Sequence, residues 1–129
     1  MTKTPSEKLK ESMTKYRRKC QSIVKISNNI RYAGVVNAYG KTLAGIIKPN
    51  VKPLMKSEIM KNELFIISTL MTLRKETTRV LGKLDYVLLQ HQKISVPILQ
   101  KNNVTYYITI DRKEKNRSNE IITSIKKII

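Results

Sequence analysis

The side chains that supply nucleophiles, general bases or metal ligands are few in this sequence. It has one histidine, His91, and one cysteine, Cys20. His91 lies between two glutamines at the predicted end of a strand, where an exposed or hydrogen-bonding role is expected. Cys20 falls on the apolar stripe of a predicted helix, which favours a buried and unreactive thiol. Neither residue indicates catalysis, which needs several reactive groups converging on one point.

Other signatures of enzyme chemistry are also missing. The acidic residues Glu58, Glu63, Glu76 and Asp85 are scattered among basic neighbours rather than paired as an acid/base couple. The glycine-rich motifs GxGxxG and GxxxxGK, which cradle phosphates, do not occur. We therefore predict a protein that is not an enzyme, with no cofactor and no metal site. An enzyme with an unrecognised site is a minor alternative.

Positive charge is the strongest compositional feature. The chain has 26 Lys and Arg against 9 Asp and Glu, a formal net charge of +17. Basic residues outnumber acidic ones in every segment, so this is no detachable basic tail. Such a field attracts nucleic acid, acidic proteins and anionic ligands alike. The charge therefore predicts an anionic partner without choosing its kind.

Two basic clusters are candidate sites. The anion-binding candidates combine one residue of the first predicted strand with four near the end of the central helix: Arg31, Arg74, Lys75, Arg79 and Lys83. The alternative is that these cations only complement the dipole of the helix C-terminus. The nucleic-acid candidates lie on the first helix: Lys15, Arg17, Arg18 and Lys19. A solvated helix face is the alternative for them.

Periodicity predicts the elements that must position these residues. Apolar residues at alternating steps of four and three indicate a first helix over about residues 6–26, capped by Ser6. A hairpin follows, with strands Ile30–Val36 and Thr42–Ile47. Gly34 and Gly45 in these strands suggest that another backbone or a helix packs close by.

The second half of the chain predicts one long helix, three strands and a last helix. The long helix runs from a Ser57 cap to a stop at Gly82. The strands are Leu84–Gln90, Ile94–Leu99 and Val104–Ile110, with Pro97 placing the middle one at an edge or a bulge. Ser118 can cap a final helix, whose isoleucines share one face. The order is α-β-β-α-β-β-β-α.

This order resembles the roadblock/longin group of profilin-like folds. The fold class it implies is α/β (α+β), a five-stranded antiparallel sheet with helices on both faces, and we expect residues 1–129 to form a single roadblock-like domain. The runs IRYAGVVNAYGKTLAG, VKPL, LRKE, LGKLDYVLLQHQK and YYITID also look like an uncharacterised small-domain family of ammonia-oxidising archaea. That second resemblance implies kinship but no reaction and no cofactor.

The roadblock resemblance implies a homodimer that acts as a scaffold or as a regulator of small GTPases. Domains of this group commonly associate through sheets or central helices. The central helix has a wide apolar face, which a dimer needs, although an ordinary buried helix needs it too. Our dimer-interface candidates are Leu64, Ile67, Leu70 and Met71.

The expected compartment is the cytoplasm. A lone cysteine fits a reducing environment, and the N-terminus has no apolar run of the kind found in secretion signals. The most apolar window, Leu64–Leu73, is about half the roughly 20 residues that a membrane span needs. We thus predict a regulatory or scaffolding module that binds itself and an anionic ligand or acidic protein, with nucleic-acid binding as the alternative.

Overall fold

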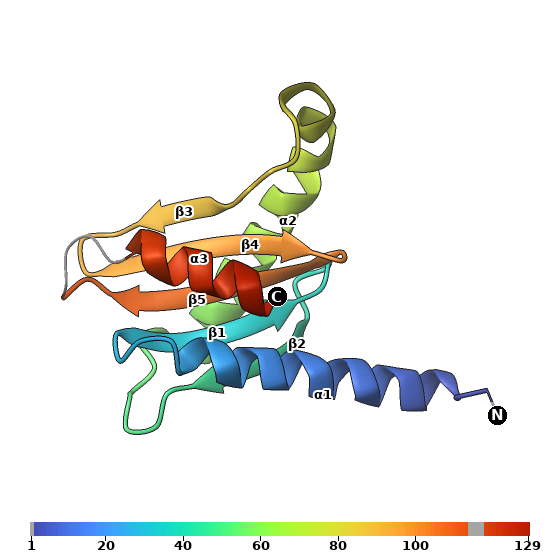
Figure 1. Cartoon of the computed structure of the whole chain (residues 1–129), viewed down its shortest axis with the longest axis horizontal. Coiled ribbons are helices and arrows are strands. Elements are labelled where there is room, and N and C mark those ends of the chain that lie inside the picture. Colours follow the sequence, from blue (N-terminus) through green and yellow to red (C-terminus); the bar gives the residue numbers. More distant parts are fainter. Residues whose placement is uncertain (1, 114–117) are drawn as a thin grey trace.

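Three helices and five strands form the part of the chain that the structure describes. A computed structural model covers residues 2–113 and 118–129. The elements are α1 (Pro5–Val24), β1 (Ile30–Val36), β2 (Thr42–Ile47), α2 (Ser57–Leu81), β3 (Val87–Gln90), β4 (Ile94–Lys101), β5 (Val104–Asp111) and α3 (Ser118–Ile128). The predicted element order is confirmed (Figure 1).

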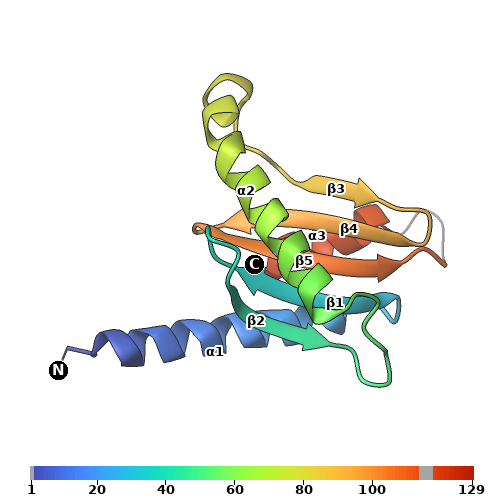
Figure 2. The same ribbon diagram turned by 180° about the vertical axis from the view of Figure 1, so that it is seen from behind.

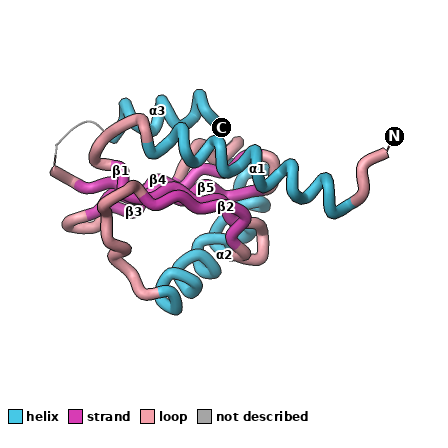
Figure 3. Tube along the Cα trace, turned by 90° about the horizontal axis from the view of Figure 1, so that it is seen from below, coloured by secondary structure: helices cyan, strands magenta, loops and turns pink. Residues whose placement is uncertain are grey.

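The strands form one antiparallel sheet with helices on both faces, as predicted. Their spatial order is β2-β1-β5-β4-β3. Helices α1 and α3 cover one face and α2 covers the other (Figure 3). Successive side chains of a strand point to opposite faces. Tyr106 therefore packs in the cluster under α1 and α3, where it makes an edge-to-face contact with Tyr16, while Tyr107 packs in the cluster under α2.

The helix starts differ from the predicted caps. Thr4, not Ser6, caps α1: the Glu7 amide donates to Thr4 Oγ1 at 3.2 Å, and Glu7 Oε2 accepts from the Thr4 amide at 3.4 Å. This capping box leaves Pro5 in the first helical position, where its missing N–H costs nothing. Lys56, rather than Ser57, is the N-cap of α2, and Ser118 is itself the first residue of α3.

The prediction for Pro97 was wrong. Strand β4 lies inside the sheet, between β5 and β3, and its register with β5 is the same before and after the proline. Regular pairing with β5 is interrupted at Val96 and Pro97, because proline has no N–H to donate. The strand pair tolerates this one missing N–H donor without a bulge. Strand β3 is also shorter than predicted, since it begins at Val87.

Gly34 and Gly45 make room for an aromatic ring rather than for a backbone or a helix. They pair across β1 and β2, and the ring of Tyr32 lies over both. A Cβ on Gly34 would be 2.7 Å from Tyr32 Cζ, and one on Gly45 would be 2.8 Å from the Tyr32 hydroxyl oxygen. The same ring makes an edge-to-face contact with Tyr107, with centroids 6.5 Å apart. The Tyr32 ring thus fills the space over the two glycines on the side of the sheet that α2 covers.

Both long helices extend past the sheet. The N-terminal half of α1 projects to one side, and the C-terminal end of α2 projects beyond β3 (Figure 2). Accordingly Leu9 and Met13 are exposed, although they lie on the same stripe as the buried Cys20 and Ile23. None of the helices in residues 2–113 and 118–129 has both the length and the hydropathy of a membrane-spanning segment.

Candidate interaction surface

The outer side of α2 carries a stripe of exposed apolar side chains at every seventh residue. Ile59, Ile66, Leu73 and Val80 are 54%, 60%, 69% and 84% exposed. Seven residues are nearly two helical turns, so these side chains line up along the helix. Single exposed apolar residues are normal on a surface, but four that line up along one side of a helix indicate an interaction site. We call these four residues the α2 stripe.

The predicted dimer residues lie on the other side of the same helix. Leu64, Ile67 and Met71 are 4%, 2% and 1% exposed and pack against Val36, Val96 and Tyr107 of their own sheet. Leu70 is partly exposed at the border between the two sides. In this arrangement the first three residues build the core of the monomer. The heptad spacing of Ile59, Ile66, Leu73 and Val80 marks a second apolar side of the helix in the sequence, but it does not tell which side faces outward.

The anion-binding candidates separate into two groups. Arg31 lies beside the first turns of α2, where it lines a cavity with Met60 and Glu63. Arg79 is sixteen residues beyond Glu63, about 24 Å at 1.5 Å per residue. Arg74 is partly buried, whereas Lys75, Arg79 and Lys83 are exposed at the projecting helix end. Arg31 therefore does not lie with the other four candidates. The cations at the C-terminal end of α2 interact favourably with the dipole of that helix.

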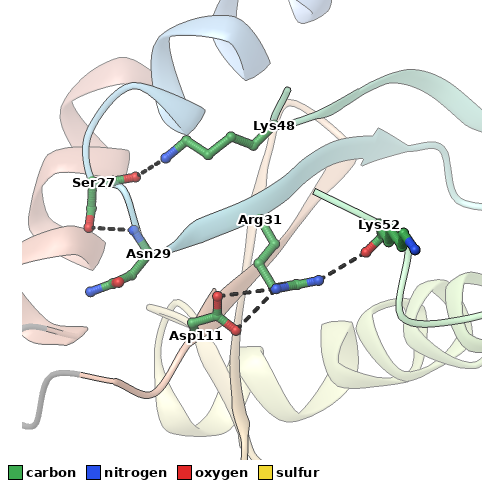
Figure 4. Close-up of polar contacts among 6 residues, drawn as sticks. All are labelled: Ser27, Asn29, Arg31, Lys48, Lys52 and Asp111. Carbon is green, nitrogen blue, oxygen red and sulfur yellow. Dashed lines mark hydrogen bonds and ion pairs between the residues drawn. The ribbon is translucent and has the colours of Figure 1, made fainter. Parts of the chain in front are cut away.

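Arg31 has a structural partner instead. Its guanidinium lies 3.2 Å from Asp111 Oδ2 on β5 and donates to the Lys52 carbonyl at 2.9 Å (Figure 4). Both members of the ion pair are about one-fifth exposed. Lys48 Nζ donates to the Ser27 carbonyl at 2.6 Å. These bonds tie the segment between β2 and α2 to the neighbouring strand and to the end of α1.

The overall arrangement is similar to that of solved roadblock/LC7 structures. MglB from Myxococcus xanthus aligns with a TM-score of 0.70 and 14% identity, over 92% of this chain and 84% of that one. A Roadblock/LC7 domain from Streptomyces avermitilis gives 0.66 and 8%, over 87% and 89%. An MglB described as having a tetrameric arrangement gives 0.56 and 12%, over 99% and 92%. This chain has a roadblock/LC7-like fold. No family model matches it, and no curated protein matches it in sequence.

In this roadblock-like fold the nucleic-acid candidates lie on the outer side of α1. Lys15, Arg18 and Lys19 line one shallow depression there, together with Lys10 and Glu11, and Arg17 is not among its lining residues. The pKa of Lys19 is lowered, first by burial and then by the charges of Lys15 and Lys101. Three of the four candidates therefore face one depression.

In the roadblock-like fold Cys20 lies in the apolar cluster under α1 and α3, on the other face of the sheet from His91 and Glu63, which both line a cavity beside the first turns of α2. Cys20 lies on the side of α1 that faces the sheet and is fully buried, and burial raises the pKa of its thiol to about 12. His91 is exposed in the turn between β3 and β4. The Tyr107 hydroxyl donates to Glu63 Oε2 at 3.0 Å; burial and that carboxylate raise the pKa of Tyr107. Among the described residues, no three His, Cys, Asp or Glu side chains are grouped to hold a metal ion.

Proposed function

We propose that this protein is a non-enzymatic regulatory or scaffolding module that works as a homodimer. The observation that carries the proposal is the α2 stripe, which runs along the side of α2 facing away from the sheet. Two copies in contact through this stripe remove the same four side chains from water on each subunit, as a symmetric interface requires. Assembly also occurs among proteins of this fold, since one MglB structure is described as tetrameric.

The second part of the proposal is an acidic partner bound by the basic surface. The +17 charge favours encounter with anionic molecules. The projecting end of α2, with Lys75, Arg79 and Lys83, presents cations without a neighbouring sheet to cover them. We further place the module in the cytoplasm, as one domain over residues 1–129, with kinship to the archaeal family named above.

The test of the dimer is a mass measurement across concentration. Size-exclusion chromatography with light scattering is expected to give twice the 14.9 kDa chain mass at high micromolar protein, and less on dilution. A monomer mass throughout the range would refute the homodimer. A dimer mass that does not change with the α2 stripe variants discussed below would assign the contact to another surface.

Nucleic-acid binding is the second candidate, favoured by the depression formed by Lys15, Arg18 and Lys19 on α1. Fluorescence anisotropy with DNA, RNA and poly-glutamate in a salt series separates the two partner classes. Binding of DNA or RNA near 150 mM salt that is lost in Lys15→Glu/Arg18→Glu would favour this candidate. Binding of poly-glutamate alone would favour an acidic protein. If neither DNA, RNA nor poly-glutamate binds even at low salt, both candidates are excluded.

A further inference from the structure

A cavity lies under the segment that joins β2 to α2. Its volume is about 420 Å³, within the range of roughly 300–1,000 Å³ that is usual for small-molecule sites. Its floor is the α2 side of the sheet, its roof is the segment around Val51–Met55, and its end wall is the first turns of α2. This cavity is separate from the α2 stripe, because none of the stripe residues lines it.

The interior of the cavity is mainly apolar. Tyr32 and Val96 form its floor, while Met55 and Met60 close it from the roof and from α2. Tyr107 also lines it, but its hydroxyl is bonded to Glu63, the acidic residue of the lining. With that carboxylate engaged, the walls suit the apolar body of a ligand.

Cations from three different elements stand around this apolar interior. Arg31 comes from β1, Lys52 from the roof and Lys93 from the turn before β4. Against them stand two carboxylates, Glu63 in the lining and Asp111, which pairs with Arg31, so the cations are in excess by one charge. A carboxylate or phosphate that meets such cations forms charge-assisted hydrogen bonds, which are about twice as strong as neutral ones. The charge of the lining therefore selects an anionic head group.

The roof is held in place by the Arg31 network. Arg31 donates to the Lys52 carbonyl and pairs with Asp111, so the roof is attached to β1 and through it to β5 (Figure 4). The hydrogen bonds of Arg31 come from Nη1 and Nη2, and its Nε–H has no partner among the described residues. Arg31 can thus hold the roof and still donate to an anion.

We propose that this cavity binds a small amphipathic anion, with a carboxylate or phosphate near Arg31, Lys52 and Lys93 and an apolar chain against Tyr32, Met60 and Val96. The site does not depend on the homodimer proposed above. Arg31 then binds the ligand at a site away from Lys75, Arg79 and Lys83.

The methionines provide site-specific probes of this proposal. Met55 and Met60 line the cavity, whereas Met13 lies on α1 and Met71 in the core. With ¹³C-methyl methionine in the full chain, octanoate and octyl phosphate should shift the Met55 and Met60 signals and leave that of Met13 unchanged. Octan-1-ol and octylammonium, which have the same chain, should bind at least about tenfold more weakly, since they lack the anionic head. Acetate and inorganic phosphate should cause no shift at the same concentration.

Variants separate the cavity from other apolar surfaces. Lys52→Glu/Lys93→Glu should weaken octanoate binding at least about tenfold, while Lys41→Glu/Lys75→Glu, with the same net charge, should not. Met60→Trp, which fills the cavity, should abolish the Met55 shift, and Leu73→Glu should preserve it. Octylammonium binding as tightly as octanoate, or an unaltered affinity in Lys52→Glu/Lys93→Glu, would overturn the proposal. Methionine methyl signals that shift only at Met13 would overturn the proposal as well.

Discussion

Replacing Leu73 by Glu is expected to break the proposed homodimer and leave the monomer folded. Leu73 is 69% exposed on the outer side of α2, so the fold of one subunit buries little of it. Met71, two residues earlier and about 200° around the helix, is 1% exposed against the sheet. The pair Leu73→Glu and Met71→Glu therefore tests the two sides of one helix with the same substitution.

The size of the effect follows from the exposed fraction. Burying a whole Leu side chain is worth about 1.5–3 kcal/mol, so burying the exposed two-thirds is worth about 1–2 kcal/mol in each subunit. A symmetric interface contains the side chain twice, which gives about 2–4 kcal/mol per dimer. At 1.4 kcal/mol per tenfold, the dissociation constant should rise roughly 30- to 700-fold. The buried carboxylates of the variant add to this loss.

Sedimentation velocity and thermal unfolding together measure the prediction. Leu73→Glu should sediment as a monomer at concentrations where the unchanged chain is a dimer, with a cooperative unfolding transition. Met71→Glu should lose that transition, because it buries a charge in the core. Thr72→Glu, an exposed position between them, controls for the added charge. A dimer with unchanged affinity in Leu73→Glu, or a folded Met71→Glu, would refute the assignment of the two sides.

Three further predictions concern the fold. Gly34→Ala should lower the free energy of unfolding by roughly 1–3 kcal/mol, measured by urea titration, because the new Cβ displaces the Tyr32 ring; an unchanged midpoint would contradict this packing. Cys20 should resist a thiol reagent until the protein unfolds. The pKa of the Cys20 thiol is about 12 in the folded state and 9.0 in the unfolded state, so its contribution to stability is complete below pH 9 and is lost as pH rises toward 12. Cys20→Ala should therefore make the free energy of unfolding fall less steeply in this alkaline range. Thr4→Ala removes the cap of α1 and should cost about 1 kcal/mol, seen as faster amide exchange in the first turns; equal exchange rates would mean that the capping box contributes little.

The order of elements could be predicted because periodicity and turn residues mark it locally. The bounds of β1 and β2 agree with the prediction, since Asn37 and Gly40 end one strand before the other begins. The isoleucine face of α3 is buried as predicted for the same reason: every apolar residue of that helix points one way.

Features that depend on two distant segments could not be predicted. Both sides of α2 are apolar, so its pattern did not tell which side meets the sheet, and Ile67 and Met71 were assigned to the partner side. The distance between Arg31 and Arg79 depends on the direction in which α2 crosses the sheet. The cavity depends on the Tyr32 ring and on the bond from Arg31 to the roof, neither of which has a periodic signal.

The separation of the two apolar clusters by the sheet has a consequence for how such a chain can diverge. Tyr106 and Tyr107 are neighbours in sequence, yet each belongs to a different cluster and contacts a different tyrosine. A substitution under α1 and α3 can be compensated there without repacking the α2 side, provided that the strands keep their register. Each side can then accumulate changes on its own without altering the backbone arrangement.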